Sequence, residues 1–117
     1  MKRPTITAHT LVINEERWIW YAINSVIDYV DKVLVFDTGS TDNTVRIVKS
    51  LKSPKIQFEQ KGQVDKKGFT KLRQEMLDKT KTDWFLILDG DEVWTETAVK
   101  ELIREIAEAR KDKEAIV

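Results

Sequence analysis

The sequence predicts a three-layer α/β/α fold built on a mostly parallel sheet. Short runs of β-branched and apolar residues, typical of strands, alternate with segments whose apolar residues recur at helical spacing. The length of 117 residues corresponds to about one domain, and the 41% hydrophobic content is sufficient for a packed core. No repeat or low-complexity segment interrupts this pattern. We therefore expect a single domain over residues 1–117, with helices on both faces of the sheet.

The first half of the chain predicts three strands and two helices. Residues 5–13 (TITAHTLVI) are typical of a strand, and residues 15–30 place their apolar side chains on one helical face. Residues 32–36 (KVLVF) predict a short buried strand. A second helix follows and is expected to end before Pro54. Residues 55–60 predict a weaker strand towards the edge of the sheet.

The second half repeats the alternation. Residues 60–67 (QKGQVDKK) predict an exposed loop, followed by a third helix whose inward residues begin at Phe69. Residues 84–88 (WFLIL) form the most apolar run and predict the central strand. A last helix is expected over about residues 95–111, and residues 114–117 look like the start of another strand. We therefore expect a domain truncated at its C-terminal end, whose uncovered apolar residues favour self-association.

Composition excludes several kinds of chemistry. The 20 Lys and Arg balance 20 Asp and Glu, which argues against a general nucleic-acid surface or a polybasic membrane surface. The absence of cysteine excludes disulfides, thiolate catalysis and Cys-ligated metals, and a single histidine excludes a multi-histidine metal site. No secretory leader and no membrane-spanning apolar run is visible, so we expect a cytoplasmic protein. Carboxylates and other oxygen groups are left to carry the function.

The strongest candidate site is Asp89-Gly90-Asp91, which follows the apolar run at residues 84–88. Ligands of open parallel sheets bind beyond the carboxyl ends of the strands. Two carboxylates one residue apart at such a place can share a hard divalent cation, and the glycine between them lets a ligand approach the backbone. The alternative is a turn whose solvated acids precede the next helix.

Carboxylates also follow the first two predicted strands. Asp37 lies too far ahead of the second helix to cap it, so we expect its side chain to face a ligand. Asp42 is better explained as a residue that caps the start of that helix. Glu15 and Glu16 open the first predicted helix, where a favourable interaction with the helix dipole is the alternative to ligand binding.

Other side chains have a structural explanation from the pattern alone. Arg73 is either a solvated helix charge or a group that binds a nucleotide or diphosphate. His9 lies within the first strand and is expected to be a buried residue with its hydrogen bonds satisfied. Trp18, Trp20 and Tyr21 flank an apolar stripe, and packing is favoured over a sugar-binding platform.

Three stretches together resemble family 2 glycosyltransferases of the GT-A fold. They are TLVINEE (residues 10–16), VLVFDTGSTDNT (residues 33–44) and WFLILDGDE (residues 84–92), in the order and at the spacing of that family. The ordered set is more specific than any one motif. It implies that the chain forms the Rossmann-like, nucleotide-binding half of a GT-A fold.

The resemblance also implies which residues bind a nucleotide-diphosphate sugar. Asp37 would contact the nucleotide base. The loop from Thr10 to Asn14 would lie against the nucleotide, with Glu15 nearby.

In the same family pattern Asp89 and Asp91 form the D-x-D motif. Asp91 would be the firmer ligand of a Mn²⁺ or Mg²⁺ ion, and Asp89 would lie nearer the ribose and diphosphate while sharing the metal site. Arg73 follows the Gly68-Phe69 stretch and would reach the base or diphosphate. The residue after it is Gln74, where the family usually has Asn.

The resemblance implies an inverting transferase that moves a sugar from a nucleotide-diphosphate sugar to the hydroxyl of a glycan or lipid-linked acceptor. This chain would carry the donor-binding half, and its motifs leave the catalytic base unassigned. The location implied is cytoplasmic, or peripheral at the inner face of the membrane, with a homodimer as a further expectation. The alternatives are a Mg²⁺-binding receiver-like module and a haloacid dehalogenase-like phosphatase, which also place acids at strand ends.

Overall fold

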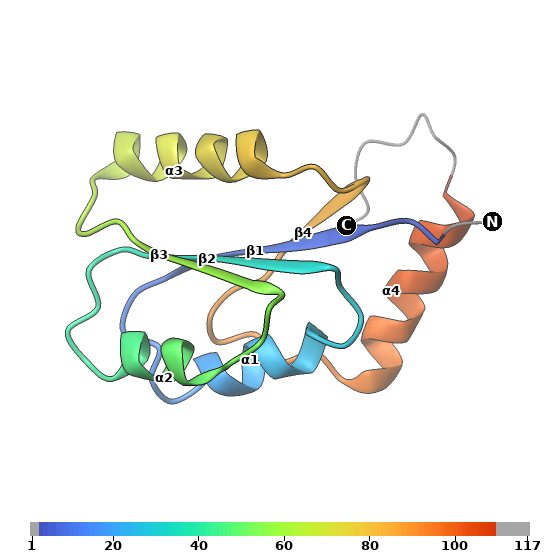
Figure 1. The fold of residues 1–117 in the computed structure, drawn as a ribbon, viewed down its shortest axis with the longest axis horizontal. Coiled ribbons are helices and arrows are strands. Elements are labelled where there is room, and N and C mark those ends of the chain that lie inside the picture. The colour runs from blue at the N-terminus through green and yellow to red at the C-terminus, as the bar shows by residue number, and fades with distance from the viewer. Residues whose placement is uncertain (1–2, 110–117) are drawn as a thin grey trace.

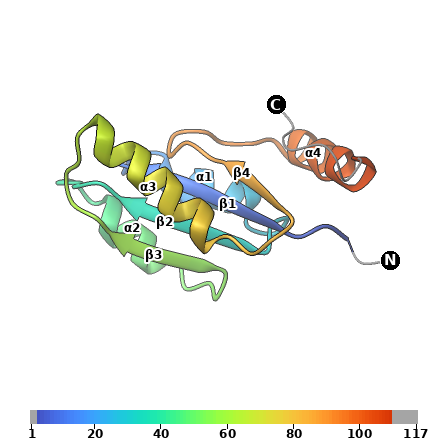
Figure 2. The same cartoon turned by 90° about the horizontal axis from the view of Figure 1, so that it is seen from above.

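The computed structural model describes residues 3–109 and shows a parallel sheet with helices on both faces (Figure 1). The strands are β1 (Ile6–Val12), β2 (Lys32–Asp37), β3 (Ile56–Gln60) and β4 (Trp84–Ile87). The helices are α1 (Ile19–Val26), α2 (Thr44–Ser50), α3 (Lys66–Lys79) and α4 (Glu96–Glu108). Helix α3 covers one face of the sheet, and α1 and α2 cover the other (Figures 1 and 2). The predicted three-layer α/β/α fold is confirmed.

Strand β2 supplies side chains to two separate parts of the core. In β2, Val33 and Val35 pack on the α1 side, whereas Leu34 and Phe36 pack beneath α3. All four side chains are at most 1% exposed. This follows from the pleat, which directs successive side chains to opposite faces. Complete burial of one such side chain stabilises the fold by about 1.5–3 kcal/mol. Because β2 buries side chains on both faces, it stabilises the packing of both helix layers on the sheet.

The strand order corrects one prediction. The order is β3-β2-β1-β4, so among residues 3–109 the apolar strand β4 forms an edge and is not central. The predicted edge position of β3 is confirmed. Phe85 and Ile87 on β4 are 41% and 49% exposed. The apolar composition of β4 predicted burial on both faces, whereas α3 lies mainly over β2 and leaves these two side chains partly uncovered.

Helix α1 is shorter than predicted at both ends. We expected it to begin at Glu15, but residues 16–18 form a turn and the helix begins at Ile19. The amides of Glu15 and Glu16 donate to the side chains of Thr44, the first residue of α2, and Asp42, in the loop after β2. At the other end Tyr29 N donates to Val26 O in a tighter turn that ends the helix.

Side-chain caps define the starts of α3 and α4. Asp65 accepts from Gly68 N (2.8 Å), so α3 begins at Lys66, within the segment predicted as a loop. Thr95 accepts from Ala98 N (3.1 Å) and begins α4 as predicted. Such caps each contribute about 1 kcal/mol. The expected end of this helix at residue 111, the strand at 114–117 and self-association through that end lie outside the described residues.

Four charged side chains hold α3 against the edge strand β3. Lys61 lies 3.0 Å from Glu59 and 2.6 Å from Glu75, and Lys79 lies 2.6 Å from Glu59 and 3.1 Å from Glu75. Hydrogen bonds from Lys79 and Lys61 hold the pKa values of Glu59 and Glu75 below their usual range. Both ammonium groups also lie over the Phe36 ring, 4.6 and 5.5 Å from its centroid. This charge network attaches α3 to the end of β3.

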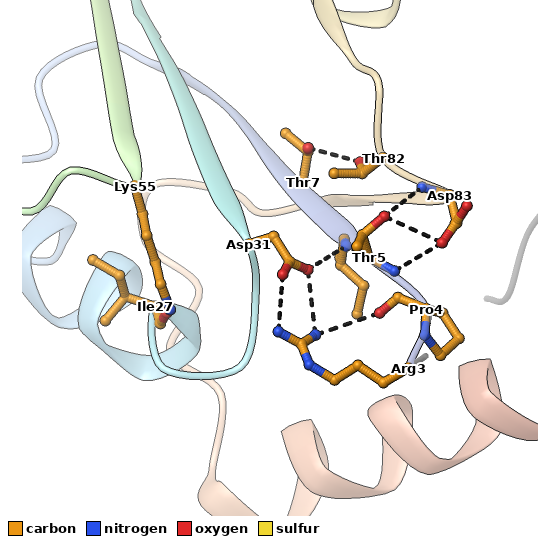
Figure 3. Close-up of polar contacts among 10 residues, drawn as sticks. Arg3, Pro4, Thr5, Thr7, Ile27, Asp31, Lys55, Thr82 and Asp83 are labelled. Carbon is orange, nitrogen blue, oxygen red and sulfur yellow. Dashed lines mark hydrogen bonds and ion pairs between the residues drawn. The ribbon is translucent and has the colours of Figure 1, made fainter. Parts of the chain in front are cut away.

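A second polar network fixes the amino ends of β1 and β4 (Figure 3). Asp31 accepts from Arg3 (2.8 Å) and from the Ile6 amide (2.8 Å). Asp83 accepts from Thr5 N (3.0 Å), and Thr5 Oγ1 in turn accepts from Asp83 N (3.0 Å). These contacts fix the strands at the end opposite the carboxylate motifs.

Among residues 3–109, no helix combines the length and hydropathy needed to cross a lipid bilayer.

His9 is a buried sheet histidine, as predicted. The Thr80 hydroxyl donates to Met76 O (2.7 Å), so it accepts from His9 Nε2–H at 2.6 Å. The imidazole stacks on Phe85, with ring centroids 4.9 Å apart. Burial and, to a smaller extent, the nearby Arg73 guanidinium lower the pKa of His9 to about 4. The neutral ring thus joins β1, β4 and the end of α3.

Acidification is expected to destabilise the fold through His9. Between its ordinary pKa of 6.5 and its folded pKa of about 4, the unfolded chain binds a proton that the folded chain does not. The His9 contribution is therefore complete above the ordinary pKa and falls as the pH drops through this window, by at most roughly 3 kcal/mol. Urea unfolding at neutral pH and near pH 4.5 will measure it. His9→Gln, which keeps an amide donor for Thr80, is expected to lose less stability on acidification than the wild type, and equal losses would contradict this account.

Candidate functional site

The loops that follow β1, β2 and β4 lie at one edge of the sheet. The three strands run parallel, and Val12 at the end of β1 is opposite Asp37 at the end of β2. Figure 1 shows the carboxyl ends of the strands pointing the same way. We call residues 13–18, 38–43 and 88–95 the strand-end loops. They contain most of the side chains that the sequence singled out.

Asn14 joins the first strand-end loop to the second. Its backbone has a φ of 50°, a left-handed conformation that asparagine tolerates better than most residues. Its side-chain oxygen Oδ1 accepts from Thr41 N (2.8 Å) and Asp42 N (3.3 Å). The backbone N–H of Asn14 donates to Ser40 Oγ (2.9 Å). Asn14 therefore holds the two loops in register.

Asp37 organises the turn that follows it. The residue is 2% exposed. Its Oδ2 accepts from Gly39 N (3.2 Å) and Ser40 N (3.1 Å), and its Oδ1 accepts from the Ser40 hydroxyl. An ionised carboxylate has about four lone-pair sites, and these hydrogen bonds use three of them. The sequence predicted that the Asp37 side chain faces a ligand. In the structure its carboxylate is hydrogen-bonded to the turn that follows it.

Asp42 precedes Asn43, the N-cap residue of α2, and its side chain binds the first residue of the helix, close to the predicted capping role. Its Oδ1 accepts from Thr44 N (2.9 Å) and the Thr44 hydroxyl (2.6 Å), and its Oδ2 accepts from Glu16 N (3.2 Å). Burial opposes ionisation, but these hydrogen bonds from Thr44 and Glu16 hold the pKa of Asp42 below its usual range. The Thr44 hydroxyl oxygen also accepts from Glu15 N (2.9 Å), and Glu16 accepts from Asn43 N (3.1 Å). Glu15 and Glu16 are therefore part of the contact between loops and do not lie in the first turn of a helix.

The Asp89-Gly90-Asp91 turn packs against the loop after β1. Gly90 is buried, whereas Asp89 and Asp91 are exposed. A Cβ atom at Gly90 would lie 2.9 Å from Val12 Cγ2 and 3.0 Å from Glu15 Cγ, closer than real Cβ atoms normally come. Glycine at this position therefore allows the third strand-end loop to reach the first, with both carboxylates left at the surface.

This contact brings the carboxyl group of Glu15 close to a second acid. Burial raises the pKa of Glu15, and the negative charges of Asp91 and then Asp42 raise it further. Among residues 3–109, no set of three His, Asp or Glu side chains is arranged to hold a metal ion unaided. Mg²⁺ commonly uses only one or two protein carboxylates and completes its shell with water and phosphate oxygens. The exposed oxygen donors of Asp89 and Asp91, beside the Glu15 carboxyl group whose pKa is raised, fit such an ion.

Glu92 closes the third loop. Its Oε1 accepts from Asp89 N (3.3 Å), and its amide donates to Asp89 O (3.0 Å). The sequence left Glu92 without a role. The structure uses it to fix the backbone from which both aspartates project.

Two predicted site residues lie apart from the loops. Thr10 is completely buried, and its hydroxyl has no hydrogen-bond partner among residues 3–109. Arg73 lies midway along α3 close enough to His9 to lower the pKa of that ring. Its Nη1 is buried and likewise has no partner within residues 3–109. The side chains of Thr10 and Arg73 therefore make no hydrogen bond to the strand-end loops.

Sequence reasoning also missed a neighbour of the second loop. Gly39 has a φ of 99°, and a Cβ there would lie 2.8 Å from Gln63 Cγ. Gln63, in the segment between β3 and α3, thus covers the turn that Asp37 organises. The positive φ at Gly39 could be expected from its D-T-G-S context, but no local pattern points from that turn to a residue in a distant loop.

Comparisons with known proteins extend the geometric result. The family model described as glycosyl transferase family 2 matches residues 8–114. The prophage-derived glycosyltransferase SunS of Bacillus subtilis strain 168 is 31% identical over 93 residues, which cover 79% of this chain and 21% of SunS. An uncharacterized glycosyltransferase of Rickettsia felis is 40% identical over 87 residues, 74% of this chain and 29% of that protein. The chain thus spans less than a third of the length of these relatives.

Two solved structures share the fold. Staphylococcus aureus TarS 1-349 matches with a TM-score of 0.67 at 23% identity, covering 87% of this chain and 32% of TarS. The mannosyltransferase PcManGT of Pyrobaculum calidifontis, solved in complex with GDP-Man and Mn²⁺, matches with a TM-score of 0.70 at 22% identity, covering 92% of this chain and 32% of that protein. Both are glycosyltransferases with the GT-A fold.

The family match decides against the receiver-like and phosphatase alternatives, which belong to other families. It agrees with the three motifs and with the sheet that positions them. The chain belongs to glycosyl transferase family 2.

Proposed function

We propose that this chain is the donor-binding part of an inverting glycosyltransferase that uses a nucleotide-diphosphate sugar and a divalent cation. The observation that carries the proposal is the joining of three loops at one sheet edge. Asn14 links the first loop to the second, and the approach of Gly90 to Glu15 links the first to the third. A ligand with a base, a ribose and a diphosphate would contact all three loops.

The proposed roles follow the positions of the side chains. Asp37 would accept from the nucleotide base with the part of its carboxylate that its own turn leaves unused. The backbone between Thr10 and Asn14, rather than the buried Thr10 hydroxyl, would face the nucleotide. Arg73 would supply its unpaired Nη1 to the base or diphosphate if α3 or the side chain adjusts on binding.

The third loop is the proposed cation site. Asp91 would be the principal ligand of Mn²⁺ or Mg²⁺, and Asp89 would share the ion and lie near the ribose. When bound, the cation would neutralise the diphosphate of the leaving group. The elevated pKa of Glu15 supports this assignment, because an added positive charge would relieve the repulsion between that carboxyl group and Asp91. PcManGT, whose structure contains GDP-Man and Mn²⁺, is a fold neighbour with this combination of ligands.

The acceptor side of the reaction needs groups that these motifs do not supply. The acceptor hydroxyl would attack the anomeric carbon, lose its proton to a carboxylate and displace the nucleoside diphosphate. Asp37, Asp89 and Asp91 are assigned to the donor, and Glu92 is bound to the Asp89 amide. We therefore propose that the 117-residue chain binds the donor, and that the base and the glycan or lipid-linked acceptor site lie in the remainder of a longer protein.

The first test is the joint requirement for nucleotide and metal. Uridine or guanosine diphosphate is expected to raise the melting temperature only when Mn²⁺ or Mg²⁺ is present, because the cation joins the diphosphate to Asp91. Asp91→Asn should abolish this increase while leaving the ligand-free melting temperature equal or slightly higher, since it removes a charge that opposes Glu15. Differential scanning fluorimetry measures both quantities.

Asp78→Asn is the matched control, because this exposed aspartate lies near the end of α3 and its substitution leaves the strand-end loops intact. It should retain the full metal-dependent increase. An increase that persists unchanged in EDTA, or in Asp91→Asn, would show that no cation bridges the nucleotide at this turn.

The second test separates Asp37 from Asp42. Both carboxylates accept backbone amides, so Asp37→Asn and Asp42→Asn should each lower the free energy of unfolding by about 1 kcal/mol. Only Asp37→Asn should also weaken the affinity for nucleotide, since Asp42 is occupied by Thr44 and Glu16. Calorimetric titration and urea unfolding distinguish the two effects. Equal losses of affinity in both variants would show that the second loop acts only as a unit.

A further inference from the structure

Gln63 lies beside the turn that Asp37 organises, although it belongs to the connection between β3 and α3. A Cβ atom on Gly39 would lie 2.8 Å from Gln63 Cγ and 3.2 Å from Gln63 N. Lys61 N also donates to Asp37 O (2.8 Å), so two contacts join this connection to the second strand-end loop. Figure 1 shows the β2–α2 and β3–α3 connections at the same end of the sheet. The Gln63 carboxamide is bonded to the carbon that packs against Gly39, which places it at the candidate site.

The residues on both sides of Gln63 hold its backbone in this position. Gly62 has a φ of 73°, a left-handed conformation that favours glycine, and it turns the chain after Lys61. The Lys61 ammonium group is paired with two glutamates of the charge network. Val64 packs against the part of the core beneath α3, and Asp65 caps that helix. Gln63 is therefore presented from a fixed backbone between two anchored segments.

Three polar side chains of the second strand-end loop are already hydrogen-bonded within the fold. The Ser40 hydroxyl donates to Asp37, and the Thr38 hydroxyl donates to a backbone carbonyl of β1 (3.2 Å). The Asp42 carboxylate accepts from the first residue of α2. Gln63, by contrast, is exposed, and its carboxamide makes no hydrogen bond to any residue from 3 to 109. It offers both a donor and an acceptor beside the Asp37 turn.

The edge of a nucleobase determines which side chains can bind it. Uracil presents a ring N–H next to a carbonyl oxygen, and guanine presents the same pair. In cytosine and adenine the corresponding pair is reversed, because the ring nitrogen accepts and the neighbouring amino group donates. An ionised carboxylate only accepts, whereas a carboxamide can donate. Asp37 and Gln63 together therefore match the uracil and guanine pattern.

We propose that Gln63 is a further base-contacting residue, whose carboxamide donates to the carbonyl of uracil or guanine next to the N–H that Asp37 accepts. The proposal rests on the donor site described under the proposed function, and it adds the selection of the base. The diphosphate and the cation are assigned to the third strand-end loop and do not involve Gln63. The site would thus select uridine and guanosine diphosphates over cytidine and adenosine diphosphates.

Calorimetric titration with these nucleoside diphosphates in the presence of Mn²⁺ tests the proposal. The wild type should bind uridine or guanosine diphosphate more tightly than cytidine and adenosine diphosphates. Gln63→Ala should weaken binding of the preferred nucleotide by about fivefold, as expected for one neutral hydrogen bond, and should reduce the preference over cytidine diphosphate by the same factor. Gln63→Glu, which keeps the size of the side chain but cannot donate when ionised, should weaken binding at least as much.

Gln57→Ala is the matched control, because it removes the same carboxamide near the amino end of β3, where the group donates to Glu59 (3.3 Å). This variant should bind every nucleotide as the wild type does. Inorganic diphosphate with Mn²⁺ has no base and should bind equally to Gln63→Ala and to the wild type.

Two results would overturn the assignment of Gln63 and leave the donor site intact. One is an unchanged affinity of both Gln63 variants for the preferred nucleotide. The other is an equal loss of affinity for all the nucleotides and for inorganic diphosphate, which would indicate that Gln63 only supports the loop. A wild type that binds no nucleotide in the presence of Mn²⁺ would instead contradict the donor site itself, and the assignment of Gln63 with it.

Discussion

The side chain of Asn14 fixes the distance between the loops after β1 and β2, and the arrangement of the candidate site depends on it. Its side-chain oxygen accepts from the backbone N–H groups of Thr41 and Asp42. The backbone N–H of Asn14 donates to the Ser40 hydroxyl. Parallel strands bring their carboxyl ends to one edge of a sheet, but they do not determine the conformation of the loops that follow. Asn14, held at a φ of 50°, supplies that further constraint.

The third loop is positioned by a different kind of contact. At Gly90 the lack of a side chain lets the turn after β4 approach Val12 and Glu15 within van der Waals distance. The same approach places acidic groups near one another, which explains why the pKa of Glu15 is raised by burial and by Asp91. The close packing of this turn therefore determines both the path of its backbone and the position of two exposed carboxylates beside the partly buried Glu15. We propose that a bound cation would relieve this repulsion.

The local pattern of apolar residues was sufficient to predict most of the helices and strands. The period of apolar residues predicted the alternation of strands and helices, including the start of the last helix at about residue 95. The edge position of β4 could not be predicted, because an apolar run does not specify its neighbours in a sheet. The hydrogen bonds of Asp37 to its own turn were missed although their partners are only two and three residues away, because the same strand-end carboxylate could equally face a ligand. The exposure of Trp20 was missed because it depends on which elements cover α1. The motifs predicted which loops meet at the candidate site, but they did not predict which atoms of those loops are already hydrogen-bonded within the fold.

The central claim is that the three strand-end loops form one nucleotide-diphosphate site, and amide chemical shifts measured during a titration test it most directly. With Mg²⁺ present, uridine or guanosine diphosphate should shift the amides of residues 13–16, 38–43 and 89–92 along a single binding curve. The amides lining the hollow of about 300 Å³ between α1 and the α2–β3 connection, such as Asn24 and Lys52, should not move. Shifts confined to that hollow, or separate binding curves for the three loops, would contradict the claim.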